Sequence, residues 1–148
     1  MTSWIFQGNP ATYRIDDAVR NLKSTTWLVN KNHRKMAPGD TVYLWRSEHQ
    51  GKPAGIVAKT KMTSIVTPLF SPPEVREFWV DPNADNTRDD RVWLEILEFC
   101  EDENIIERGI FLKSELLSSM QIIRQPNGTN YELTDVEAEI IEDMWNNR

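Results

Sequence analysis

Short segments rich in β-branched and aromatic residues, each closed by turn-forming residues, recur along this chain and restrict it to a β-rich fold. Ser3–Gln7 ends at Gly8-Asn9-Pro10, and Ala37-Pro38-Gly39-Asp40 leads into Thr41–Trp45. Gly55–Met62 has the composition of a strand that pairs back onto Thr41–Trp45. Further strand candidates are Ile65–Val66, Val92–Cys100 and Gln121–Arg124, the second with both faces largely covered.

Two helices are predicted, one near each end of the chain. The first is marked by helical spacing of the apolar residues Ile15, Ala18, Val19 and Leu22. The second begins at a capping box formed by Thr134 and Glu137. Its apolar stripe consists of Val136, Ile140, Ile141, Met144 and Trp145. Lys113–Ser118 is expected to form a helical turn. With five to seven mostly antiparallel strands, these elements predict an α+β domain built on a curved sheet or small barrel.

The 148 residues contain no repeat or linker, so we expect a single domain over residues 1–148. The composition, 39% hydrophobic and 27% charged, is typical of a soluble globular domain. No signal peptide or membrane-spanning run is visible, which predicts a cytoplasmic protein without membrane contact.

Sequence signatures of enzymes and metal sites are missing. The chain has no G-x-S-x-G, no phosphate-binding glycine loop and no H-E-x-x-H. Cys100 is the single cysteine and ends an apolar strand candidate, so we expect a buried, unreactive thiol. His33 and His49 lie among polar residues and are expected at the surface. We therefore expect no catalysis, no metal and no cofactor.

The net charge of −6 conceals an asymmetry between the two halves of the chain. Residues 1–70 hold ten Lys and Arg against four Asp and Glu, whereas residues 71–148 hold seven against nineteen. A basic half can attract phosphate groups, but the two halves can also interleave in the fold so that their fields average out. Charge alone leaves both interpretations open.

Six tryptophans are a large number for this length. We expect four of them in the core, namely Trp4, Trp45, Trp93 and Trp145. Trp27 and Trp79 flank loop-like sequence, the latter inside a long polar stretch, residues 70–91, of a length that is usually functional or mobile. These two rings are either ordinary core residues or aromatic plates that sandwich a planar ligand.

Two longer motifs carry a family resemblance. Trp4-Ile5-Phe6-Gln7-Gly8-Asn9-Pro10 opens the chain, and Gly39-Asp40-Thr41-Val42-Tyr43-Leu44-Trp45-Arg46-Ser47 follows. Together with Trp27-Leu28-Val29-Asn30, they resemble the EVE domain, a branch of the PUA-like superfamily related to YTH domains. The resemblance extends along nearly the whole chain. It implies a PUA-like pseudo-barrel that binds DNA or RNA and holds a modified, flipped-out base in an aromatic pocket.

The resemblance also implies site residues. Asn9 would lie at the pocket mouth, Trp27 and Trp79 would form its aromatic walls, and the main chain of Leu28 would bond the base. In this role we expect Trp27 to face a solvent-open pocket. The candidate phosphate contacts in the basic half are Arg34, Lys35, Arg46 and Lys59.

Two other functions stay open at this stage. The same pocket could serve a small-molecule or nucleotide-binding enzyme, or the acidic C-terminal half could dock a protein. A nuclease would be a fitting partner for a reader of modified bases, because the pair would cleave modified nucleic acid.

Overall fold

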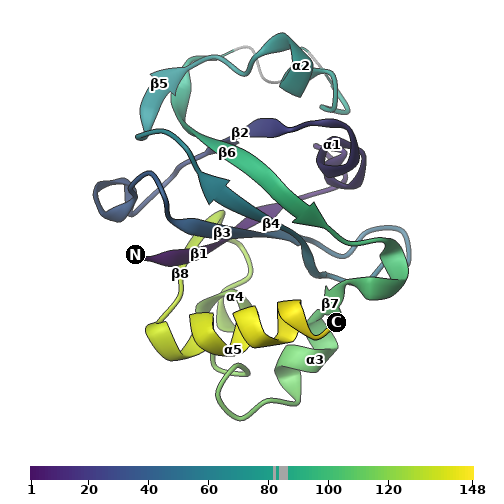
Figure 1. The fold of residues 1–148 in the computed structure, drawn as a ribbon. Helices are drawn as coiled ribbons and strands as arrows, with labels where there is room; N and C mark the ends of the chain where they lie inside the picture. The colour runs from purple at the N-terminus through teal and green to yellow at the C-terminus, as the bar shows by residue number, and fades with distance from the viewer. Residues whose placement is uncertain (82, 84–86) are drawn as a thin grey trace.

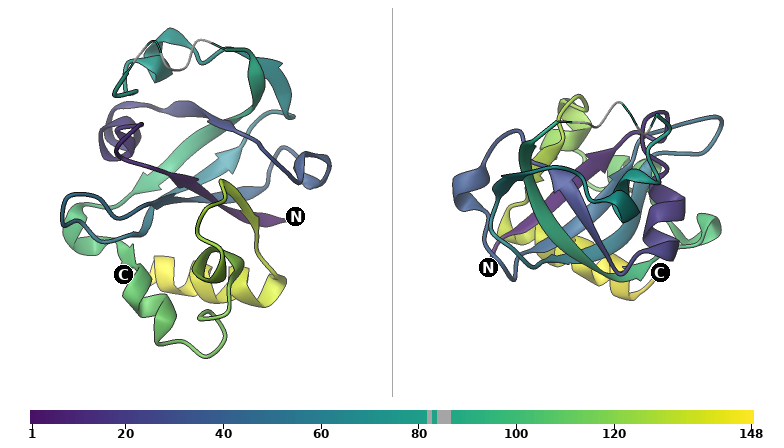
Figure 2. Two further views of the ribbon diagram at one scale, coloured as in Figure 1. Left: turned by 180° about the vertical axis from the view of Figure 1, so that it is seen from behind. Right: turned by 90° about the horizontal axis from the view of Figure 1, so that it is seen from above.

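An eight-stranded sheet, curled into a half-barrel, forms the centre of the computed structural model (Figure 1 and Figure 2). The structure describes residues 1–81, 83 and 87–148. The strands in this part of the chain are β1 (Ser3–Gly8), β2 (Ser24–Leu28), β3 (Thr41–Arg46), β4 (Gly55–Met62), β5 (Thr67–Leu69), β6 (Asp89–Phe99), β7 (Ile106–Glu107) and β8 (Asn130–Glu132).

The strand order is β2-β6-β4-β3-β1-β8, with β5 paired to β6 and β7 paired to β4. Strands β1 and β3 run parallel, and every other pairing of the described residues is antiparallel. The predicted α+β fold on a curved, mostly antiparallel sheet is therefore confirmed, with eight strands among the described residues instead of the expected five to seven. Strand β2 lies at one end of this order, so one of its edges has no strand partner.

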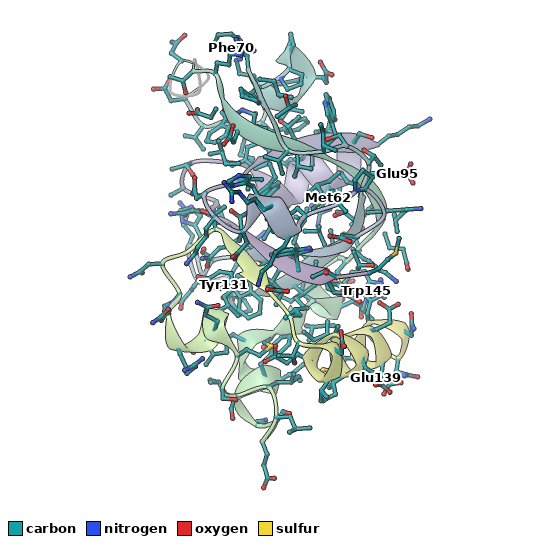
Figure 3. All side chains as sticks on the ribbon, turned by 90° about the vertical axis from the view of Figure 1, so that its left-hand side faces the viewer. Met62, Phe70, Glu95, Tyr131, Glu139 and Trp145 are labelled. Carbon is teal, nitrogen blue, oxygen red and sulfur yellow. The ribbon has the colours of Figure 1, made fainter. Side chains whose placement is uncertain are left out.

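Helices lie at the ends and on one side of the half-barrel (Figure 1). They are α1 (Ile15–Asn21), α2 (Pro73–Arg76), α3 (Arg108–Leu112), α4 (Gln121–Arg124) and α5 (Asp135–Asn146), with 3-10 turns η1 (His33–Lys35) and η2 (Asp102–Asn104). Both predicted helices are present, and Thr134 and Glu137 form the predicted capping box of α5. Figure 3 shows Trp145 on the side of α5 that faces the sheet and Glu139 on the opposite side. No helix among the described residues is long and apolar enough to cross a bilayer.

The prediction of a strand at Gln121–Arg124 is wrong, because this segment is the short helix α4. The main-chain N–H groups of Ile123 and Arg124 both donate to the carbonyl of Met120. Ile122 is buried, so packing outweighs the strand preference of two adjacent isoleucines. Lys113–Ser118 contains the expected helical turn, because the N–H group of Ser118 donates to the carbonyl of Ser114 over 2.9 Å.

The strand expected at Ile65–Val66 begins two residues later, as β5, and includes Pro68. Strand β5 pairs with β6 alone in the described structure, so it is an edge strand. A proline lacks a main-chain N–H group, which an edge strand can do without on its open side. Pro68 therefore does not interrupt the strand.

Strand β6 is less covered than predicted. The register between β4 and β6 shifts between Lys59 and Thr60, which leaves Leu97 outside the paired positions. Leu97 is 46% and Phe99 39% exposed, so the last part of the strand carries apolar side chains to the surface. Trp93 is half-buried, whereas the other three predicted core tryptophans are buried. Val136, expected in the buried stripe of α5, is exposed.

Candidate functional site

A cavity of about 400 Å³ lies where the end of β1 meets the free edge of β2. Its walls come from Gln7 to Asn9, from Thr26–Leu28, from the turn over residues 126–129 and from Trp79. The four residues that the family resemblance placed at a base, namely Asn9, Trp27, Leu28 and Trp79, all line this cavity. The structure thus brings them together, although they come from three separate segments.

The free edge of β2 supplies main-chain groups to the cavity. The main-chain groups of Trp27 and Val29 point toward β6, since the N–H group of Val29 donates to the carbonyl of Asp90 over 3.0 Å. Main-chain groups alternate in direction along a strand, so those of Leu28 point the opposite way. In agreement, the Leu28 carbonyl accepts the side-chain amide of Asn130, at 3.0 Å. The N–H group of Leu28 therefore faces the open edge.

Trp27 forms one wall and is more buried than expected. It is 7% exposed, and its indole N–H donates to the carbonyl of Gln7 over 3.3 Å. A Cβ atom at position 8 would lie 3.0 Å from the Trp27 ring, so Gly8 allows this close approach of ring and strand. The expectation of a solvent-open cage residue is corrected, because Trp27 belongs to both the core and the cavity wall.

Tyr13 connects the two tryptophans. Its ring centroid lies 5.7 Å from that of Trp27, edge to face, and 5.2 Å from that of Trp79. Its hydroxyl shares a hydrogen bond with Thr25, at 3.2 Å. Sequence reasoning did not assign a site role to Tyr13. Its one sequence signal is its place three residues after the motif that ends at Pro10.

The turn over residues 126–129 is held against β1 by Gln7. The side-chain amide of Gln7 donates to the carbonyls of Pro126 and Gly128, at 2.8 and 2.7 Å. The Tyr131 hydroxyl accepts from the Gly128 N–H group and donates to the Gln125 carbonyl, both over 2.7 Å. Burial raises the pKa of Tyr131, so this hydroxyl keeps its proton for the second bond. The wall is therefore built before any ligand binds.

Asn9 lies exposed at the rim. Its side-chain oxygen accepts the N–H group of Ala11, at 2.9 Å, which fixes the side chain in a local turn. Among the described residues, no partner takes the two donors of its amide nitrogen, so they remain available to a ligand. The one charged group of the described cavity wall is the guanidinium of Arg91, which is 1% exposed and donates to the carbonyl of Leu69. Sequence reasoning missed Arg91.

Arg46 cannot contact a phosphate group in this structure, contrary to the prediction. Its side chain is 1% exposed, and it lies 3.2 Å from Asp16 and 3.3 Å from Asp102. It also donates to the carbonyl of Pro53. Strand β3 is central and buried at five successive positions, with a register shift between Leu44 and Trp45, which explains why a strand arginine is enclosed.

Lys59, the other strand residue predicted to contact phosphate, is engaged within the fold. It forms an ion pair with Glu142 of α5, and the Tyr43 hydroxyl donates to the same carboxylate. Its side chain is only 18% exposed. Lys59 therefore ties the sheet to α5 instead of reaching a ligand.

The pKa of Glu142 predicts how its contacts with Lys59 and Tyr43 respond to acid. Burial alone would raise it, but hydrogen bonds from Lys59 and Tyr43 outweigh burial and hold the pKa below the ordinary value of 4.5. A lowered carboxyl pKa stabilises the fold above the unfolded-state pKa, and this contribution is lost as the pH falls through the folded-state pKa. We expect the melting temperature to fall on acidification below about pH 4.5, and Glu142→Gln to make that fall shallower. Glu139→Gln on the outer side of α5 is the control, and equal curves for E142Q and wild type would contradict the prediction.

Arg34 and Lys35 lie in η1, just beyond β2. Asn30, two residues after β2, donates to the hydroxyl of Thr129 in the cavity wall, at 3.1 Å, and η1 begins three residues further along the chain. Arg34 is exposed and forms no ion pair with a described residue. Lys35 is 3.1 Å from Glu132 and 62% exposed.

The cavity wall of the described residues carries no carboxylate, histidine or cysteine. Cys100 is buried and lies outside this wall, and burial raises its pKa. His33 is exposed, as expected, and His49 is partly buried. Among the described residues, no group of three or more His, Cys, Asp and Glu side chains could hold a metal. The arrangement can stack against a planar group and offer it hydrogen bonds.

Comparisons with known proteins identify the family and the fold. The family model of the EVE domain matches residues 2–144. No curated protein sequence matches the chain. A hypothetical protein from Leishmania major superposes with a TM-score of 0.71 at 16% identity, over 97% of this chain and 94% of that chain.

Two further solved structures have the same fold. Human THYN1 protein in complex with 5-methylcytosine containing DNA has a TM-score of 0.70 at 16% identity, over 95% of each chain. A protein from Pseudomonas syringae has a TM-score of 0.68 at 15% identity, over 96% of this chain and 98% of that chain. At such low identity, the likeness shows a shared fold.

Proposed function

This chain belongs to the EVE domain family, and on that premise we propose that it is a non-catalytic domain that binds nucleic acid through a modified, flipped-out base. The observation that carries the proposal is the cavity walled by Trp27 and Trp79 beside the free main-chain edge of Leu28. The similar fold of human THYN1, solved with 5-methylcytosine containing DNA, supports it. A cavity of about 400 Å³ is within the usual range for a small planar ligand.

In this proposal, the site residues stack on the base, bond its edge or contact phosphate groups. The Trp27 and Trp79 rings stack on the base, a contact that contributes roughly 1–3 kcal/mol per base. That gain offsets the few kcal/mol that are needed to unstack the base. The Leu28 N–H group and the Asn9 amide bond the edge of the base. Arg34 and Lys35, both in η1, contact phosphate groups of the strand.

Calorimetry with a set of oligonucleotides tests the function. The set pairs DNA and RNA strands that carry a methylated base with unmodified strands of the same sequence. We expect saturable binding without turnover, stronger for a modified strand. Product formation would instead support an enzyme that uses the same cavity. If no oligonucleotide of the set bound, the result would contradict the proposal and favour a protein-docking module. A nuclease partner would be sought only after binding is seen.

Salt dependence tests the phosphate contacts. The logarithm of the affinity should fall linearly with the logarithm of the salt concentration, and Arg34→Ala should lower the slope by about one. The matched control is Arg124→Ala, an exposed arginine on α4 outside the cavity wall. Binding that does not depend on salt would count against a nucleic-acid ligand and favour a free nucleotide.

A further inference from the structure

Two buried polar atoms in residues of the cavity wall have no hydrogen-bond partner among the described residues. They are the hydroxyl oxygen of Thr26 and the indole nitrogen of Trp79. Thr26 is 4% exposed, so solvent does not satisfy its hydroxyl. The other side chains with such an atom, Arg46, Ser71 and Arg76, do not line this cavity.

Buried polar groups in folded proteins nearly always have partners, because an unpaired one costs stability. Such groups persist where they serve a ligand, since a functional site can retain a feature that weakens the fold. Valine has the shape of threonine without the hydroxyl, and packing alone would be served better by valine here. The hydroxyl of Thr26 therefore requires an explanation other than stability.

We propose that Thr26 is a specificity-determining residue, whose hydroxyl hydrogen-bonds a heteroatom of the bound base. This inference rests on the proposed function. The Trp79 N–H lies in the plane of a ring whose face stacks on the base, so it has no part in this bond. A hydroxyl can donate or accept, so Thr26 selects a heteroaromatic ring that presents a polar atom, and not an apolar edge, on the side facing Thr26.

The position of Thr26 on β2 supports this role. Its neighbour Thr25 is also buried, but the hydroxyl of Thr25 is bonded to Tyr13. Thr26 and Leu28 are two residues apart, so their main-chain groups point to the same free edge. A base bonded to the Leu28 N–H group would thus lie next to the main chain of Thr26, a residue of the same cavity wall.

The test compares Thr26→Val and Thr26→Ser with the wild-type chain, using a DNA strand that carries 5-methylcytosine and the same strand with an abasic site at that position. We expect T26V to bind the methylated strand roughly five- to tenfold more weakly, and T26S to retain wild-type affinity. On the abasic strand, the two variants and the wild type should bind equally.

Thermal melting supplies an independent readout. T26V should melt at the wild-type temperature or slightly above it, because it removes an unpaired hydroxyl. The matched control is Thr60→Val, since the hydroxyl of Thr60 is buried and donates to the Val42 carbonyl at 2.9 Å. T60V should lower the melting temperature and leave affinity unchanged.

Three results would overturn the inference. Equal binding of the methylated strand by T26V and wild type would refute it while leaving the proposed function intact. A clear loss of thermal stability in T26V would show that the hydroxyl already has a structural partner. If the wild-type chain bound no strand of the wider oligonucleotide set, the proposed function itself would fail and this inference with it.

Discussion

Trp27→Ala is expected to abolish selective binding of a modified strand and to lower stability at the same time. Loss of a stacking wall should remove roughly 1–3 kcal/mol of binding free energy, about five- to over a hundredfold in affinity. Because Trp27 is 7% exposed and touches Tyr13, its removal also takes packing from the core. Affinity must therefore be measured at a temperature where the variant is folded.

Trp45→Ala separates the two effects. Trp45 is 2% exposed, packs against Phe111 with 5.4 Å between ring centroids, and does not line the cavity. A fully buried tryptophan cut to alanine typically loses about 3–5 kcal/mol of stability. We expect the larger drop in melting temperature for W45A and the larger drop in affinity for W27A.

Trp27→Phe adds a graded variant that keeps an aromatic face and loses the N–H bond to Gln7. It should recover part of the affinity, since stacking depends on the face of the ring. If the folded W27A chain bound a methylated strand as tightly as the wild type, Trp27 would be a core residue alone. The aromatic-wall mechanism would then be wrong.

The elements of this fold that could be predicted are those set by residues close together in the sequence. The capping box of α5 and the strands that begin at Ser3 and Thr41 are set by neighbouring residues, and they appear where expected. Segments whose form depends on distant partners were missed or misassigned. Strand β2 is held by β6, and α4 takes its form from burial of Ile122.

The candidate site divides in the same way. The family resemblance pointed to Asn9, Trp27, Leu28 and Trp79, which line one cavity, and their role in binding stays a prediction. The supports of the cavity involve residues about a hundred positions apart, such as the Asn130 amide on the Leu28 carbonyl. Spacing along a sequence carries no signal for such contacts. Charge counting failed for the same reason, because it cannot tell an exposed arginine from an enclosed one.

Arg46→Ala is expected to lower stability as much as the loss of a core tryptophan. The Arg46 guanidinium is buried between two acidic side chains and the Pro53 carbonyl. Removal of one partner from a buried ion pair typically costs about 3–5 kcal/mol, because the other charge stays buried without compensation. In R46A, Asp16 would be the carboxylate without compensation, since its side chain is only 20% exposed. Asp102 is half exposed, so water can hydrate it.

Acid should weaken the same network. A hydrogen bond from Lys52, with the nearby charges of Lys52 and Arg46, holds the pKa of Asp102 below its ordinary value of 3.8 despite some burial. Its lowered pKa stabilises the fold above that value, and this contribution is lost as the pH falls through the folded-state pKa. Arg46→Ala should therefore reduce the acid sensitivity of the melting temperature as well as the temperature itself.

Arg34→Ala is the matched control, because Arg34 is exposed and Arg46 is not. At roughly 2–4 °C per kcal/mol for a domain of this size, R46A should melt about 6–20 °C below the wild type. R34A should melt at the wild-type temperature. The salt slope of binding should behave in the opposite way, falling by about one in R34A and staying unchanged in folded R46A. A lowered slope in R46A would place this arginine on the nucleic acid after all, since a purely structural arginine releases no counterion when the strand binds.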